Sequence, residues 1–472
     1  MSNDLRRTLT LQDSISMVAG NMIGCGIFVV SAETARMVKS SFLLLLVWLI
    51  AGLVSLIGAL AYGELAANIT EEGGQYMYLK KIYNDLTAFS YGWTLFLVIQ
   101  TGSIAAISLA FAKFLGTVVP WINSTNYLFQ FGFFHMSTVQ LIALFICVLI
   151  TYINSRGVES GVITQNIFTV TKILSLIAIV ACGIFFGINW PVIHQNFPAG
   201  FATMHLNDLH VVASATVGAL FAAITWNNIT FIAGEIKEPE KNIPRSMVYG
   251  VGLVVILYLL INAVYVYTIP LDAIAHAHED IVASAVMGAI FGQIGRNVLA
   301  VILMISAFGC ANGMILTGSR VYYKMAKDRL FFRNMAAINR RTKVPVNSLW
   351  MQCLWICCLI LFVGNYNALL DFVIYVNLIF YAITTFGIFV YRRKFPDEKK
   401  ILRVNNFFPV VFIASIICIV VSLTFDKPQT TLPGLLITLA GIPVFYFWDR
   451  TKKQKIAKKL EEKQTNDYYV NK

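Results

Sequence analysis

Two apolar stretches of the sequence contain small or polar residues where a helix would normally have its most regular backbone. Residues 18–28 include three glycines, and residues 218–235 carry a Trp-Asn-Asn run. A helix that opens at such a point leaves N–H and C=O groups that need a partner other than lipid. Open helix N-termini favour anions, and open C-termini favour cations. The chemistry indicated is therefore binding of a polar or charged substrate by backbone groups.

The first stretch has two interpretations. Glycine weakens a helix interior by about 0.5–1 kcal/mol relative to alanine, so Gly24 and Gly26 indicate a break that lines a wet cavity. Gly20 and Gly24 also have the four-residue spacing of a helix-packing face. The second stretch favours breaks, because Asn227 and Asn228 are costly in lipid and need to face protein, water or a ligand.

Lys172 is a third candidate, because it places one ammonium on an otherwise apolar segment, far from either end. Such a charge needs acceptors, and loosened carbonyls near the first break would supply them. The ammonium would then stand in for a coupling cation, or its role would be purely structural. Titration of this buried group during transport would allow proton coupling.

The composition places these segments in a membrane. Of the 472 residues, 58% are apolar and 13% are charged, whereas soluble domains carry about 25% charged residues. The mean hydropathy is +0.71. The net charge of +12 lies in short loops between apolar runs, which indicates membrane topology rather than nucleic-acid binding. Without a phosphate loop or a catalytic carboxylate pair, the sequence predicts an all-α polytopic membrane protein that is not an enzyme.

Cysteine and histidine do not indicate a metal site. The eight cysteines fall within apolar segments, which favours reduced thiols in packing roles. Cys353, Cys357 and Cys358 have no histidine or acidic residue near them in the sequence, so we expect no metal and no cofactor. The six histidines map to one side of the predicted membrane, where solvated loop roles are the simplest interpretation and pH sensing is the alternative.

Windows of about 20 apolar residues predict twelve transmembrane spans. They lie near residues 12–37, 42–66, 88–117, 137–154, 161–188, 210–235, 246–269, 297–326, 345–363, 366–391, 405–424 and 429–449. Lysine and arginine concentrate in the loops on one side, with Arg36 and Lys39 as the main exceptions. By the positive-inside rule, both termini, residues 1–11 and the basic tail 450–472, are predicted to be cytoplasmic.

The two interrupted spans are the first and the sixth. Breaks five spans apart are typical of two inverted five-helix repeats that hold a substrate at their interface. We therefore predict a first repeat over residues 12–190, a second over residues 210–391, and two further helices over residues 405–449.

Several motifs carry a family resemblance. They comprise an Ile-Gly-Cys-Gly-Ile-Phe run at residues 23–28, residues 61–65 with 73–78, residues 220–227 with Glu235, and residues 306–313. In these motifs the chain resembles the amino acid-polyamine-organocation (APC) superfamily, and within it the L-type amino acid transporter family of prokaryotic type. The similarity runs over nearly the whole chain.

The resemblance implies a 5+5 inverted repeat with helices 1 and 6 unwound, plus helices 11 and 12. It also implies sodium-independent amino acid transport, commonly by exchange. Carbonyls around Phe221, Ala222 and Ile224 would hold the amino group, with Phe221 as an aromatic gate and Asn227 as a polar contact near the side-chain pocket or inner gate. The substrate carboxylate would be held by backbone groups of Ile23, Gly24, Cys25, Gly26 and Ile27.

The chain departs from the family at two places. Ile224 and Thr225 stand where the family generally has a Gly-Gly pair, so their branched side chains would narrow the pocket and favour small neutral substrates. On this interpretation Ile224→Gly broadens uptake toward bulky amino acids. Residues 120–136 contain no cysteine, whereas animal members use one there to bond a glycoprotein partner. We therefore expect no disulfide-linked heavy chain.

The function predicted is a sodium-independent secondary transporter of neutral L-amino acids in a cell membrane, exchanging substrates by alternating access. Its partners would be the amino acid and the lipid bilayer. A proton-coupled symporter of amino acids or polyamines is one alternative, and a non-transporting amino acid sensor is another. The short tail after Trp448 argues against a sensor, which would need a sizeable output domain.

Overall fold

The computed structural model describes residues 7–131, 134–198, 206–362, 366–398, 400–426, 428 and 431–448. Within these residues, eleven helices are long and apolar enough to cross a membrane. A shorter apolar helix, α14 (Val346–Phe362), stands where the ninth span is predicted. The prediction of an all-α polytopic membrane protein is confirmed. The basic tail 450–472 lies outside the described residues.

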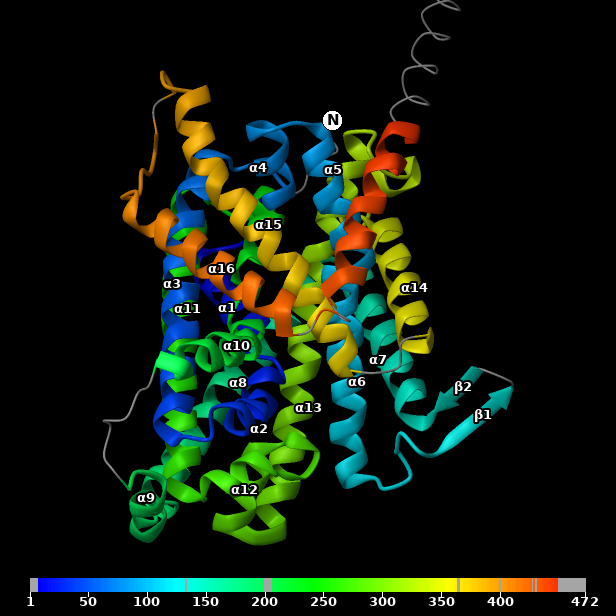
Figure 1. The fold of residues 1–472 in the computed structure, drawn as a ribbon. Helices are drawn as coiled ribbons and strands as arrows, with labels where there is room; N and C mark the ends of the chain where they lie inside the picture. The colour runs from blue at the N-terminus through cyan, green and yellow to red at the C-terminus, as the bar shows by residue number, and fades with distance from the viewer. Residues whose placement is uncertain are drawn as a thin grey trace, which may run out of the picture.

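The first half of the chain forms the helices of Figure 1 that run from blue to green. They are α1 (Leu11–Met22), α2 (Gly26–Val38), α3 (Ser41–Asn68), α4 (Gln75–Ile82), α5 (Asp85–Thr94), α6 (Gln100–Val118), α7 (Thr138–Ser155), α8 (Val158–Phe186) and α9 (Trp190–Asn196). The π-helix η1 (Leu95–Ile99) joins α5 to α6. An antiparallel hairpin of β1 (Tyr127–Phe131) and β2 (Phe134–Ser137) lies between α6 and α7.

The second half is also helical. Its elements are α10 (Leu206–Ala223), the 3-10 helix η2 (Thr225–Glu235), α11 (Pro239–Thr268), α12 (Leu271–Ala275), η3 (His278–Asp280), α13 (Val282–Lys327), η4 (Arg333–Ala336), α14, α15 (Tyr366–Lys394) and α16 (Phe407–Asp426). A final helix covers Thr431–Trp448.

Side-chain caps set where several helices begin. Thr10 and Asp13 form a capping box at α1, in which the Asp13 carboxylate accepts the Thr10 N–H at 2.8 Å. Ser137 and Gln140 form the same arrangement at α7. Each box satisfies backbone donors that a helix N-terminus leaves open. The start of α2 is different, because no side chain caps it.

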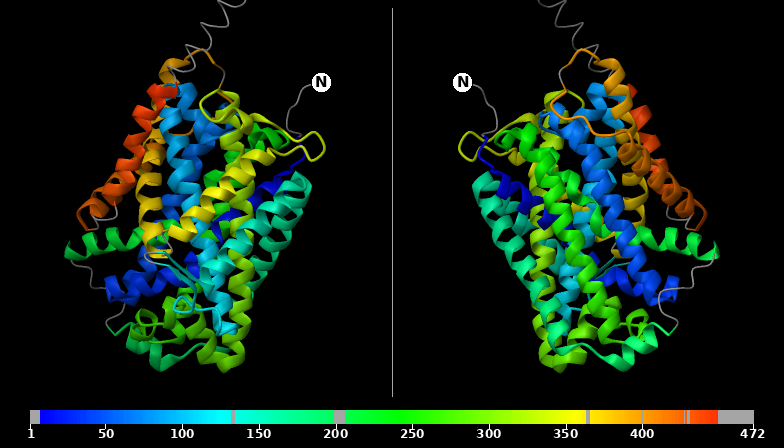
Figure 2. Two further views of the ribbon diagram at one scale, coloured as in Figure 1. Left: turned by 90° about the vertical axis from the view of Figure 1, so that its right-hand side faces the viewer. Right: turned by 90° about the vertical axis from the view of Figure 1, so that its left-hand side faces the viewer.

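The helices divide into a buried centre and a lipid-facing periphery. The first and sixth predicted spans are each 83% buried over their most apolar windows, whereas α16 and the final helix are 33% and 22% buried. Figure 2 shows α16 and the final helix on the outside of the bundle. In Figure 1, α4 and α5 lie at the end that carries the N-terminus, and α9 and α12 lie at the opposite end.

Two segments differ from their predicted form. α13 begins at Val282, well before the predicted span 297–326, and it bends at Gly292, whose φ of 62° and ψ of −144° are not helical. The hairpin of β1 and β2 occupies a segment predicted only as a loop. Both lie outside the predicted apolar windows, where hydrophobic pattern alone carries little information about local structure.

Candidate substrate site

Both predicted helix breaks are present. α1 ends at Met22 and α2 begins at Gly26, while α10 ends at Ala223 and η2 begins at Thr225. At the first break the N–H of Gly24 donates to the Met22 carbonyl at 2.8 Å instead of continuing the helical ladder. The uncapped N-terminus of α2 and the C-terminus of α10 therefore end close together in the buried centre.

A small cavity lies between these two ends. Five predicted site residues line it: Gly24, Cys25, Gly26, Phe221 and Ala222. The other predicted site residues, Ile23, Ile27, Ile224 and Asn227, do not line it.

The cavity is nearly closed in this conformation. The centre of a water molecule has only about 20 Å³ of room inside it, and a single water needs about 10–15 Å³. Gly26 allows this closeness, because a Cβ there would lie 2.7 Å from the Ala222 Cβ. Phe221 also lines the cavity and is 9% exposed. A substrate of any size therefore requires the walls to separate.

The electrostatics of the cavity follow from the two helix ends. No side chain caps the N-terminus of α2, whose first residue, Gly26, lines the cavity, and such a terminus carries about half a positive charge. The end of α10 contributes the opposite partial charge through its carbonyls. This arrangement matches a carboxylate on one side and an ammonium on the other.

Lys172 lies on α8 directly behind the first break. Its Nζ donates to the carbonyls of Gly20 and Ile23, each at 2.8 Å, and the residue is 1% exposed. The side chain reaches them across Gly309 of α13, where a Cβ would lie 2.9 Å from the Lys172 Cε. The ammonium thus holds the open end of α1, at carbonyls that the sequence analysis predicted as its acceptors.

α13 supplies further donors to the same carbonyls. Ser306 Oγ donates to the carbonyls of Ile23 and Gly24 at 3.2 Å each, and Cys310 Sγ donates to the Asn21 carbonyl at 3.1 Å. Both residues belong to a span that the sequence analysis matched to a family motif without assigning them a role. The break is therefore held by α8 and α13 together.

Comparison with known proteins agrees with this geometry. Residues 9–446 match the protein family described as amino acid permease. The chain belongs to that family. The family consists of membrane transporters of amino acids and not of enzymes, so the permease transports amino acids across a membrane.

Several curated proteins are similar to the permease over nearly its whole length. The large neutral amino acids transporter small subunit 2 of Homo sapiens is 29% identical over 456 residues, which cover 95% of this chain and 82% of that protein. The serine/threonine exchanger SteT of Bacillus subtilis (strain 168) is 27% identical over 455 residues, covering 95% and 98%. The cystine/glutamate transporter of Homo sapiens is 27% identical over 470 residues, covering 97% and 90%.

Asn21 is a cavity residue of the permease that the sequence analysis did not assign. It lines the cavity, is 1% exposed, and both polar atoms of its side chain lack a hydrogen-bond partner among the described residues. A buried amide without a partner costs about 1–3 kcal/mol. Its position between Gly20 and the break was the available signal, because an asparagine is unusual at midspan.

Asn227 lies away from the cavity in the permease. Its Nδ2 donates to Gln75 Oε1 at 3.0 Å, and Gln75 Nε2 donates to Thr384 Oγ1 at 2.9 Å. This chain of bonds joins η2 to α4 and α15. Asn227 is therefore bonded toward α4, which lies at the end of the bundle that carries the N-terminus (Figure 1), and not toward the cavity.

Two ion pairs with buried glutamates lie on the same side of the permease as α4. Glu64 pairs with Arg392, whose Nε lies 2.7 Å from Oε1, and Glu235 pairs with Arg320 at 2.8 Å. A carboxylate buried near the end of an apolar helix needs a partner of opposite charge, and each glutamate has one. Neither pair lines the cavity.

Tyr258 of α11 links the two breaks directly, although no pattern in the sequence marks it. Its hydroxyl donates to the Met22 carbonyl at 2.8 Å and also lies 3.3 Å from the Ala222 carbonyl. Tyr258→Phe removes this donor, while the Met22 carbonyl keeps its bond from the Gly24 N–H. We expect the free energy of unfolding to fall by about 0.5–1.5 kcal/mol, the size of one lost hydrogen bond, and the transport rate to fall with it.

The measurement combines SDS unfolding of the purified permease with initial uptake rates in proteoliposomes. Tyr249→Phe is the matched control, because Tyr249 lies on the same helix and is 58% exposed. Equal behaviour of the two variants would show that the Tyr258 hydroxyl does not hold the breaks together.

Proposed function

We propose that this permease is a sodium-independent exchanger of small neutral L-amino acids in a cell membrane. The observation that carries the proposal is the pairing of an uncapped α2 N-terminus with the end of α10 around one small cavity. The α2 end binds the carboxylate and the α10 carbonyls bind the ammonium. In this proposal Phe221 gates the cavity, and Ile23 and Ile27 contribute only backbone groups.

Sodium independence is supported by Lys172. Its ammonium occupies the carbonyls of Gly20 and Ile23, where a metal cation would otherwise find oxygen ligands. A fixed positive charge at this place makes a sodium ion unnecessary and repels one. The exchange mode is supported by one relative, SteT of Bacillus subtilis, which is a serine/threonine exchanger.

The proposal includes the topology and the repeat organisation. Both termini are cytoplasmic, residues 12–190 and 210–391 form inverted repeats, and residues 405–449 add two helices. The permease works without a disulfide-linked heavy chain, because residues 120–136 contain no cysteine. Alternating access moves one group of helices against the other around the fixed cavity.

The test is uptake into proteoliposomes of the full-length chain. Radiolabelled L-serine should enter only when the vesicles contain unlabelled amino acid, and replacing external sodium with choline should leave the rate unchanged. Accumulation driven by a pH gradient into empty vesicles would instead support the proton symporter. Binding of L-serine without any uptake would support the sensor. Thermal-shift measurements against the twenty amino acids and common polyamines would identify the ligand class.

Substrate size is predicted to depend on Thr225 rather than on Ile224. Thr225 lines the cavity and its hydroxyl donates to the Asn21 carbonyl at 2.9 Å, whereas Ile224 packs elsewhere, with 1% of its surface exposed. We expect Thr225→Gly to increase inhibition of L-serine uptake by L-leucine and L-phenylalanine. Ile224→Gly is the control, and this choice replaces the hypothesis drawn from the sequence. A larger effect from Ile224→Gly would restore that hypothesis.

A further inference from the structure

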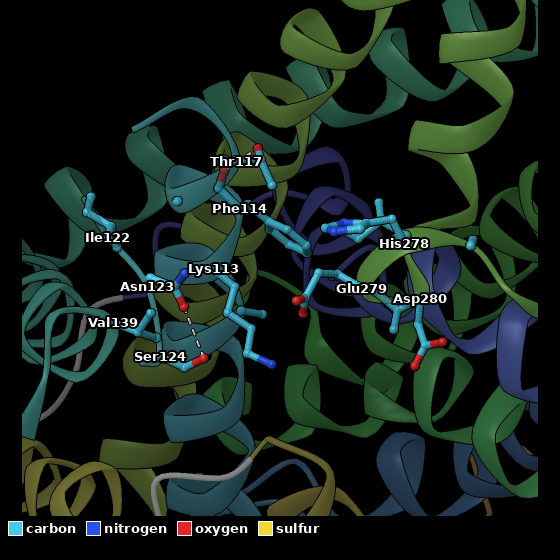
Figure 3. A pocket seen from close by; sticks show the side chains of 15 residues that line it. Lys113, Phe114, Thr117, Ile122, Asn123, Ser124, Val139, His278, Glu279 and Asp280 are labelled. Carbon is cyan, nitrogen blue, oxygen red and sulfur yellow. Dashed lines mark hydrogen bonds between the residues drawn. The ribbon is translucent and has the colours of Figure 1, made fainter. Parts of the chain in front are cut away.

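A second hollow lies at the end of the bundle opposite the N-terminus, and we call it the vestibule (Figure 3). Residues of α2, α6, the start of α7, the segment 122–124 and the segment 277–281 line it. A volume of about 460 Å³ is open to water there, within the roughly 300–1,000 Å³ range of small-molecule sites. None of its residues belongs to the central cavity.

The vestibule contains one cation and one anion that do not neutralise each other or pair with neighbours. Figure 3 shows Lys113 of α6 and Glu279 of η3 extending into the same hollow. Among the residues that the structure describes, neither side chain has an ion pair within 4.0 Å or a hydrogen bond. The neighbouring carboxylate is already used, because Asp280 pairs with Arg36 at 2.6 Å.

One face of α6 connects the vestibule to the central cavity. Ser103 and Ile107 line the cavity, and Ala110, Phe114 and Thr117 line the vestibule. The spacing of three or four residues places all five on one side of the helix. At 1.5 Å per residue, Lys113 lies about 9 Å beyond Ile107 along the helix axis.

α2 also contributes residues to both hollows. Gly26 lines the cavity, and Val29, one turn further along, lines the vestibule. The two hollows therefore adjoin along α2 and α6. A molecule bound in the vestibule would lie next to the central cavity.

We propose that the vestibule binds the α-amino acid substrate as a zwitterion before it enters the central cavity, with Lys113 on the carboxylate and Glu279 on the ammonium. This proposal rests on the proposed transport function. Opposite charges on two elements match a molecule that carries both, whereas a polyamine or a simple anion would leave one of them unmatched. Phe114, Ile122 and Val139 provide apolar wall for the substrate side chain.

The experiment measures the KM for L-serine at each face of the membrane, in right-side-out and inverted vesicles, with L-leucine in parallel. The double variant Lys113→Gln/Glu279→Gln should raise the KM at the vestibule face by about fivefold, the size expected for loss of exposed charge pairing. The KM at the opposite face and both maximal rates should stay at the wild-type level. A purely structural defect would change both faces together.

Charge controls lie on the same end of the protein but outside the vestibule. Lys39→Asn and Asp272→Asn remove the same two charges from exposed positions, and Asn suits the left-handed backbone of Lys39 at φ 48°. These controls should leave every KM unchanged. Equal KM values for the double variant and wild type at the vestibule face, or equal rises at both faces, would overturn the vestibule proposal alone. Absence of any amino acid uptake by the wild type would overturn both proposals.

Discussion

Lys172→Met is expected to reduce amino acid exchange more than tenfold. The substitution keeps an unbranched side chain of similar length but removes the ammonium that binds the carbonyls of Gly20 and Ile23, each 2.8 Å from Nζ. A hydrogen bond to a charged group contributes about 1.5–3 kcal/mol, and more than tenfold in rate corresponds to at least about 1.4 kcal/mol. Without this ammonium the end of α1 should relax and lose its alignment with α2.

The measurement is the initial rate of L-serine exchange in proteoliposomes, with and without a pH gradient. Thr171→Val is the control, because the Thr171 hydroxyl bonds only within its own helix, to the Ile167 carbonyl. Loss of exchange at every pH is the expected result. Intact exchange with loss of pH-driven accumulation would contradict it and would assign Lys172 a role in proton coupling.

The two breaks and the partners of Lys172 could be predicted from the sequence, because each involves residues that are energetically unfavourable in lipid. Glycines at midspan, paired asparagines at midspan and an ammonium in an apolar helix are all costly in lipid, so each had to have a compensating structure. The breaks at Gly24 and Ile224 and the lysine-to-carbonyl bonds supply that compensation. Residues that are unfavourable in lipid therefore allowed the position of the central cavity to be predicted.

Other residues that support the two breaks could not be recognised from the sequence, because their residue types are not unusual where they stand. Tyr258 looks like an ordinary aromatic of an apolar helix, and Gln75 looks like a loop residue after two glycines. Their roles depend on neighbours 236 and 152 residues away in the chain. Tertiary packing decides such contacts, and a single sequence does not encode them in local pattern.

The cysteines show the same limit. Spacing drew attention to Cys353 and Cys357, yet their third neighbour in space is Cys147 of α7, with Cys147 Sγ 3.8 Å from Cys353 Sγ. Cys358, adjacent in sequence, does not belong to this group. That the permease needs no metal stays a prediction.

Glu235→Gln is expected to destabilise the permease by about 3–5 kcal/mol, the usual result of leaving a buried charge unpaired. The pair with Arg320 has no exposed side-chain surface on either residue. Arg320 also donates to the Leu316 carbonyl at 2.7 Å, so it cannot swing out to solvent without losing a second bond. SDS unfolding of the purified protein measures the change, and Glu238→Gln, in an exposed pair with Lys241, should have no detectable effect.

The double variant Glu235→Leu/Arg320→Met separates stability from function. Replacing a buried ion pair with apolar side chains of similar size is often neutral for stability, so the double variant should unfold close to wild type. The N-terminal segment should also stay in place, because the N–H groups of Thr8 and Leu9 bond to the backbone carbonyl of Glu235 and not to its side chain. If uptake nevertheless stays low in this stable variant, the charge pair acts in the transport cycle, since the loss cannot then be assigned to misfolding. Recovery of uptake together with stability would limit the pair to a structural role.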